Sequence, residues 1–115
     1  MQAAIGAVHS DAGVAADTDW GQILALYDQL LTVTPTPVVA LNRCVALAEV
    51  RGPAAALDEL GRLSLDGYHL FHATRADLLR RLGRRDEARA AYDAAMARTA
   101  NGAEQSFLRR RRDSL

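Results

Sequence analysis

The stretch from Tyr68 to Ala100 constrains the fold of this chain more than any other, because it reads as two amphipathic helices joined at one glycine. Apolar side chains recur at helical spacing on each side of Gly83. A glycine just past a helix end adopts the left-handed conformation without a steric penalty. The pattern therefore predicts an antiparallel helical hairpin. Its apolar positions are Phe71, Leu78, Leu79 and Leu82 in the first helix, and Ala88, Ala91, Tyr92, Ala95 and Met96 in the second.

The small residues of this stretch match the spacing of a tetratricopeptide (TPR) repeat, a helix–turn–helix motif of ~34 residues. With Gly83 at the glycine position, Ala76 falls on the small residue of the first helix. The alanine, aromatic and alanine positions of the second helix are filled by Ala88, Tyr92 and Ala95. The stretch thus resembles a TPR unit, and the resemblance implies a module that holds other chains. An ordinary helical hairpin in an alanine-rich bundle remains the alternative.

Composition favours one soluble, helical, cytoplasmic domain. The 115 residues suit a single domain, since domains usually have ~100–200 residues. The formal net charge is zero, so no overall field attracts nucleic acid or an acidic partner. A single cysteine, Cys44, excludes an internal disulfide and fits a reducing cytoplasm. No apolar run approaches the ~18 residues of a membrane span, so we expect no membrane association.

Capping residues and prolines predict the helices before the central hairpin. Short polar side chains accept hydrogen bonds from the free amides of a helix start, and proline is favoured at the first helical position. These signals predict a helix from Trp20, another from Pro37 and a short one from Pro53, and an apolar face of Ala4, Ile5 and Val8 predicts an earlier helix over residues 2–9. The candidate N-caps are Asp17, Thr18, Asp19 and Thr36, with Asp66 for the central hairpin.

A last helix is expected after the hairpin. Asn101 and Glu104 are three residues apart, which is the spacing of a capping box. Phe107 and Leu108 would then close the open end of the core, because a stacked array needs a terminal cap. Arg109 to Arg112 would follow as a basic, frayed tail.

Together these elements predict an all-α, TPR-like array of about three antiparallel helix pairs and a C-terminal capping helix. The helix pairs would cover residues 2–36, 37–67 and 68–101, and the cap would cover residues 102–112. All of them would belong to one domain over residues 1–115.

Candidate catalytic and metal-binding residues lack the partners that such chemistry needs. His69 and His72 are three residues apart and could face one metal ion, but no further ligands accompany them at a suitable spacing. Cys44 lies among apolar residues in mid-helix, which favours a buried side chain over a nucleophile. No glycine-rich phosphate loop and no separated acyl-transfer triad are present. We expect no enzymatic activity, no metal, no cofactor and no small-molecule substrate.

Arginines form two groups that could contact nucleic acid: Arg80, Arg81, Arg84 and Arg85, and Arg109 to Arg112. Acidic residues interleave with the first group, however, and no set of aromatic side chains accompanies either group. An ion-paired, solvated helix surface is therefore favoured over a nucleic-acid interface.

The remaining candidate surface is the concave side of the array, which the first helix of each TPR pair lines. Asn42 and Arg43 are polar residues inside an otherwise apolar helix, which is costly unless they face water or a partner. Alternatively, Asn42 forms a local hydrogen bond and Arg43 pairs with Glu49 or Asp77. The predicted partner-binding residues are Asn42, Arg43, Asp77, Arg80 and Arg81, and Leu70, Ala73, Val39 and Glu49 share their face.

Four segments taken together show a closer resemblance. They are QAAIGAVHSDA, ADTDWGQILALYDQLL, TPVVALNRCVALAEVRGPAAALDEL and GYHLFHATRADLLRRLGR. These segments resemble the TPR-containing C-terminal extension of one group of bacterial extracytoplasmic-function (ECF) sigma factors, from Gln2 to about Leu108. The Asp-Gly-Pro signature of that family stands here as Arg51-Gly52-Pro53, without its acidic residue, and Ala56 replaces a common glycine.

The resemblance implies a non-catalytic regulatory domain excised from a longer sigma factor. Such a domain would contact the sigma-factor core domains or RNA polymerase and modulate transcription initiation. DNA would be contacted only through the sigma domains, which are missing from this chain. The alternative is a stand-alone TPR adaptor that binds a peptide or a partner helix.

Overall fold

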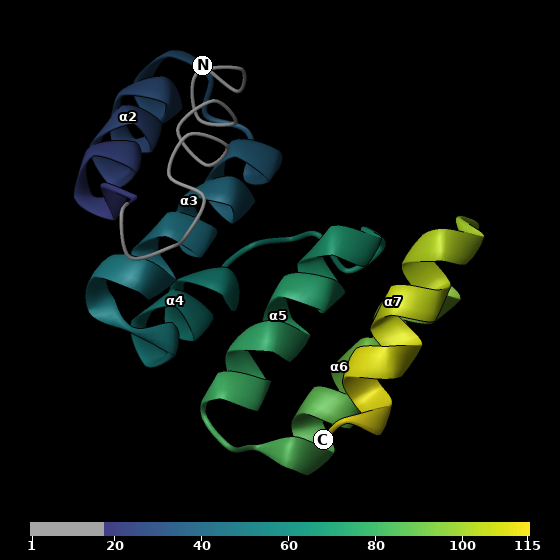
Figure 1. Cartoon of the computed structure of the whole chain (residues 1–115). Helices are drawn as coiled ribbons and strands as arrows, with labels where there is room; N and C mark the ends of the chain where they lie inside the picture. The colour runs from purple at the N-terminus through teal and green to yellow at the C-terminus, as the bar shows by residue number, and fades with distance from the viewer. Residues whose placement is uncertain (1–17) are drawn as a thin grey trace.

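The computed structural model describes residues 18–115, and this part of the chain contains six helices and no strands (Figure 1). The all-α prediction is therefore confirmed for the described residues, whereas the helix predicted over residues 2–9 lies outside them. The helices are α2 (Trp20–Val33), α3 (Pro37–Arg51), α4 (Pro53–Leu60), α5 (His69–Arg81), α6 (Arg85–Ala97) and α7 (Gly102–Asp113).

The early helices begin at the predicted capping residues. Asp19 Oδ1 accepts a hydrogen bond of 3.0 Å from the amide of Gln22, and Thr36 Oγ1 accepts one of 3.2 Å from the amide of Val39. Each bond satisfies one of the amides that a helix start leaves unpaired. Gly52, with φ of 93°, separates α3 from α4. The local sequence thus sets the starts of α2, α3 and α4.

The corner between α5 and α6 is a Schellman motif built on Gly83. This glycine has φ of 75°, and its amide donates to the carbonyl of Arg80 over 3.0 Å. The next amide, that of Arg84, donates to the carbonyl of Leu79 over 3.0 Å. These two bonds satisfy carbonyls that the helix end would leave unpaired. The predicted hairpin corner is confirmed.

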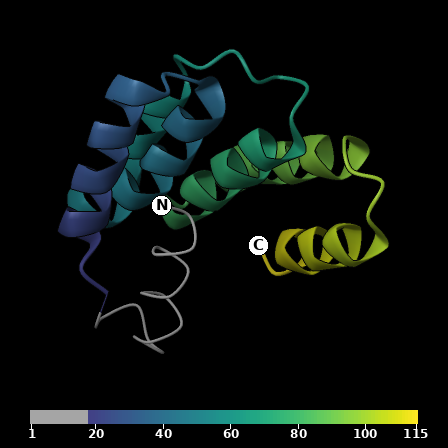
Figure 2. The same cartoon turned by 90° about the horizontal axis from the view of Figure 1, so that it is seen from above.

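Buried side chains form two clusters, and α5 belongs to both. Phe71 and Leu78 of α5 lie in the first core, which α2, α3 and α4 complete. Ala76 and Leu79, on another side of the same helix, lie in the second core with residues of α6 and α7. Seen from above, α2, α3 and α4 are grouped at one end of the molecule, and α6 and α7 lie at the other (Figure 2). Helix α5 therefore joins the two halves.

Small residues let α5 and α6 pack closely. Ala76, Ala88 and Ala95 are each 0% exposed, and Tyr92 is 2% exposed beside them. The four positions that suggested the hairpin are thus buried at the α5–α6 interface. No polar or charged side chain is fully buried among residues 18–115, so apolar burial is the main stabilising term.

The predicted cap of α5 is wrong. Tyr68 occupies the N-cap position and makes no capping hydrogen bond. Asp66 instead uses its backbone carbonyl, which lies 2.6 Å from His72 Nε2 and 2.7 Å from Arg98 Nε. This turn is held by side chains from α5 and from the end of α6, which a local capping rule does not consider.

The C-terminal helix differs from its prediction in two respects. Asn101 caps it as expected, but only Leu108 is buried, while Phe107 is 48% exposed. Adjacent helical residues point about 100° apart, because a turn takes 3.6 residues, so both side chains could not face the same narrow core. The arginine tail also remains helical to Asp113, since Arg112 pairs with Asp93 of α6 over 2.7 Å.

Replacing Tyr92 with alanine should destabilise the protein by ~3 kcal/mol, because the truncation leaves a cavity in the second core. Urea unfolding followed by circular dichroism measures the change. Arg89→Ala, at an exposed position of the same helix, should change the unfolding free energy by less than ~0.5 kcal/mol. Equal midpoints for the two variants would contradict the burial of Tyr92.

Replacing Gly83 with alanine should cost about 1 kcal/mol, since a side chain disfavours the left-handed backbone. Gly67→Ala is the matched control, because this turn glycine lies outside the left-handed region and an added Cβ meets nothing within 4 Å. Thermal melts of the two variants should therefore differ. A Gly83→Ala protein as stable as the control would exclude the strain.

Candidate functional site

An ion-pair network joins α3 and α5 and contains three of the five predicted partner-binding residues. Arg81 Nη2 lies 3.1 Å from Glu49 Oε1 of α3, and Arg81 Nε lies 3.1 Å from Asp77 Oδ2. Arg80 Nη2 donates to the other oxygen of Asp77 over 2.6 Å. The hydrogen bond to Asp77 raises the pKa of Arg80 above its ordinary value, so Arg80 stays cationic. The structure thus brings Asp77, Arg80 and Arg81 together beside Glu49.

The other two predicted residues lie apart from this network. Arg43 Nε donates to Asp28 Oδ1 of α2 over 2.6 Å, so the proposed pairing of Arg43 with Glu49 or Asp77 is wrong. Arg43 therefore faces α2, whereas Glu49 of the same helix faces α5. Asn42 is half-buried and its side chain makes no hydrogen bond to residues 18–115, so the local side-chain bond considered above is not present there.

An apolar hollow of about 240 Å³ lies between α5 and α7. Its rim carries two exposed apolar side chains, Leu70 at 43% and Phe107 at 48% exposure. His69 Nε2 lies 2.9 Å from Glu104 Oε2 and holds the two helix starts together. Ala73 and the buried Leu108 complete the hollow, to which both helices contribute.

A second hollow, of about 290 Å³, lies at the other end of these two helices and is basic. Arg80, Arg85 and Arg111 line it. The Arg111 guanidinium also lies 5.3 Å from the ring centroid of Phe107, within the range of a cation–π contact. Because the helix starts share one hollow and the helix ends share the other, α5 and α7 run in the same direction. We call this surface the α5–α7 groove.

Phe107 and Arg111 were not predicted as part of the site. A signal was present, since they are four residues apart and therefore lie on one face of a helix. That spacing does not say which helix lies alongside, so it could not place them opposite Leu70 and Arg80.

The two histidines that could have shared a metal have separate partners. His69 lies beside Glu104, and His72 Nε2 lies 2.6 Å from the carbonyl of Asp66. Among residues 18–115, no group of three histidine, cysteine or acidic side chains is placed to hold a metal ion.

Comparisons with known proteins found an uncharacterized protein of Rhizobium meliloti (strain 1021), which is 44% identical to this chain over 117 residues. The match covers 100% of the chain but 28% of the relative, so the chain spans about a quarter of that protein. No family model and no solved structure matches. Within the described residues, no helix is both long enough and apolar enough to cross a membrane.

Cys44 is the candidate nucleophile of the sequence, and its surroundings are unsuited to that role. The side chain is 2% exposed and belongs to the first core. Burial raises its pKa to about 11, the negative charge of Glu59 adds to the rise, and Arg43 opposes it. The thiol is therefore neutral at physiological pH, which makes it a poor nucleophile.

We expect Cys44 of the folded protein to react with a thiol reagent at pH 8 about a hundredfold more slowly than in the unfolded chain, because less thiolate is present. The raised pKa of Cys44 also makes the free energy of unfolding depend on pH. This contribution to stability is retained below the ordinary pKa of 9.0. It is lost between pH 9.0 and about 11, because in that interval the unfolded chain releases the proton and the folded chain keeps it.

Reaction rates with and without urea measure the first effect. Denaturation between pH 8 and 11 measures the second, with Cys44→Ala as a control that lacks this contribution. Equal reaction rates in the folded and unfolded protein would contradict the burial of the thiol.

Proposed function

We propose that this chain is the TPR-like regulatory segment of an ECF sigma factor, and that it acts in the cytoplasm by binding protein. Its partner would be the sigma-factor core domains or RNA polymerase, and binding would modulate transcription initiation. The segment itself performs no chemistry and contacts no DNA. Promoter contact belongs to the other sigma domains.

The order of the helices supports the TPR-like part of the proposal. Helices α3 and α4, and then α5 and α6, pack as successive pairs, and α3 also touches α5. The ion pair between Glu49 and Arg81 links these two first helices of their pairs. A TPR array places its first helices side by side in the same way, and α7 would continue that row.

The length of the relative supports a segment of a larger protein. All of this chain corresponds to 28% of the Rhizobium meliloti protein. In that protein, the matching segment is therefore part of a much longer chain. A regulatory segment of a sigma factor would have such a setting. The sigma-factor assignment itself rests on the four segments quoted above and on their order.

The α5–α7 groove is the observation that carries the binding proposal. It combines exposed Leu70 and Phe107 with the positive charges of Arg80 and Arg111. Aromatic side chains and arginine are enriched in protein interfaces, which favours Phe107 and the two arginines as contact residues. Of the predicted residues, Arg80 lines this groove and is bonded to Asp77, whereas Arg81 pairs with Glu49 of α3 and Arg43 pairs with Asp28.

Replacing Leu70 and Phe107 together with serine in the full-length protein should weaken binding of this segment to the sigma domains or to polymerase. A loss of about tenfold or more is expected if either side chain is an anchor residue. Stability should fall only moderately, because both side chains are about half exposed. Calorimetric titration and transcription in vitro from the target promoter measure the effect.

Val33→Ser is the matched control, since Val33 is 80% exposed at the end of α2, away from the groove. Normal binding by the double variant would exclude the groove as the contact. Unchanged transcription after deletion of the whole segment would exclude the regulatory function. Capture of an unrelated peptide, without any contact to sigma domains or polymerase, would favour a stand-alone adaptor.

A further inference from the structure

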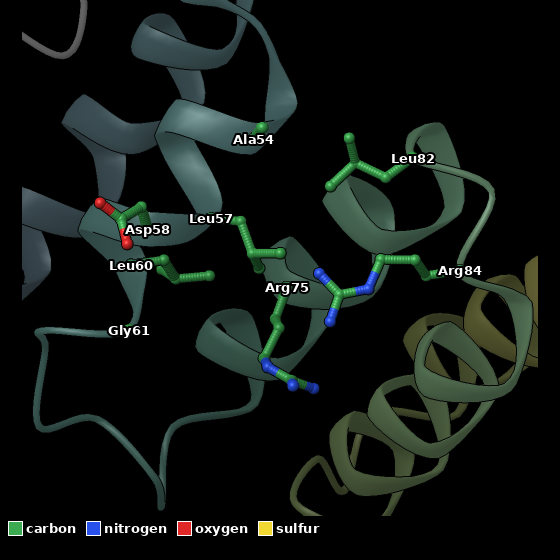
Figure 3. Close-up of a pocket in the computed structure, with 8 residues that line it drawn as sticks. All are labelled: Ala54, Leu57, Asp58, Leu60, Gly61, Arg75, Leu82 and Arg84. Carbon is green, nitrogen blue, oxygen red and sulfur yellow. The ribbon is translucent and has the colours of Figure 1, made fainter.

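A cavity of about 390 Å³ lies between α4 and α5, separate from the α5–α7 groove. Its volume falls in the lower part of the ~300–1,000 Å³ range of small-molecule pockets. Ala54, Leu57 and Leu60 of α4 form one wall, and Leu82 and two arginines approach from α5 and the turn that follows it (Figure 3). Apolar surface and positive charge therefore meet in one hollow.

Arg75 is the first unusual feature of this cavity. It is half-buried on α5, and its side chain makes neither a hydrogen bond nor an ion pair with residues 18–115. Its guanidinium nitrogens still reach solvent, because none of them is among the buried side-chain atoms that lack a partner in the described residues. They are therefore open to an anion that enters the cavity.

Arg84 provides a second guanidinium. Its Nε and Nη2 donate to the carboxylate of Glu87 over 2.9 and 2.7 Å. A guanidinium has five N–H donors, so three remain for another acceptor. Figure 3 shows that this side chain extends from the turn after α5 toward Arg75.

The acidic residue of the cavity does not oppose an anion directly. Asp58 lines the rim, but its carboxylate points away from the two arginines (Figure 3). It lies 3.7 Å from Arg62 Nη2, which offsets its charge. The remaining wall is apolar, and Leu57 packs against both the first and the second core.

We propose that this cavity binds a small organic carboxylate with an apolar tail. The carboxylate pairs with Arg75 and with the remaining donors of Arg84, since guanidinium and carboxylate match in planar, two-bond geometry. The tail lies on Leu57 and Leu82, which are partly exposed. Because Leu57 is shared by both cores, the occupied cavity would brace the junction between the two halves of the protein. This site is additional to the proposed protein contact and independent of it.

Titration of the whole chain with hexanoate, followed by two-dimensional amide NMR, tests the proposal. Signals of α4 and of the part of α5 around Arg75 should shift and reach saturation. Hexanoate should also raise the melting temperature, because it binds the folded state. Arg75→Gln should weaken binding about tenfold, as expected for loss of a charge-assisted hydrogen bond. Ala54→Leu should block it by filling the hollow.

Two controls make the test specific. Arg89→Gln removes an exposed arginine of α6 away from the cavity and should bind hexanoate normally. The Leu70→Ser, Phe107→Ser protein should also bind it normally, which separates this site from the α5–α7 groove. The proposal is overturned if hexanoate causes no saturable shift or if Arg75→Gln binds normally. Hexanol binding as tightly as hexanoate would overturn the role of the carboxylate. Inorganic phosphate binding as tightly would overturn the role of the apolar tail.

Discussion

The burial of α5 on two sides is the constraint on which the rest of this structure depends. Phe71 and Leu78 pack into the first core, while Ala76 and Leu79 pack into the second, so one helix joins both. Such a helix must be narrow where a neighbour approaches closely, and alanines at the α5–α6 interface meet this need. The Schellman corner at Gly83 then returns the chain along the same helix, so that α6 covers the second side.

With two sides buried, α5 has one face left for polar chemistry. Asp77, Arg80 and Arg81 lie there, and their charges are balanced by one another and by Glu49 of α3. Partly exposed ion pairs of this kind contribute only ~0–1 kcal/mol each to stability. Their effect is to align neighbouring helices, and they leave the apolar rim at Leu70 and Phe107 accessible. The surface proposed to bind protein therefore follows from how α5 is packed.

The arginines of this chain differ in whether a carboxylate of the protein pairs with them. Six of the fourteen arginines have a carboxylate partner within residues 18–115, such as Asp28 for Arg43 and Asp93 for Arg112. The zero net charge of the chain is consistent with this pairing. Arg75 differs from the other arginines without a carboxylate partner in residues 18–115, because those are exposed and Arg75 is half-buried. Its position against an apolar cavity makes it a candidate for ligand binding instead of helix alignment.

Local sequence determined the features that depend on neighbours along the chain. The caps at Asp19 and Thr36, the corner at Gly83 and the buried alanines all follow from spacing and backbone preference, which act within one or two helical turns. Tertiary structure alone decided that Arg43 pairs with Asp28, that Phe107 is exposed beside Leu70, and that Arg112 extends α7 by holding Asp93. These outcomes depend on which helices lie side by side and at what offset. Helical periodicity defines the faces of each helix but does not name the neighbour that covers them.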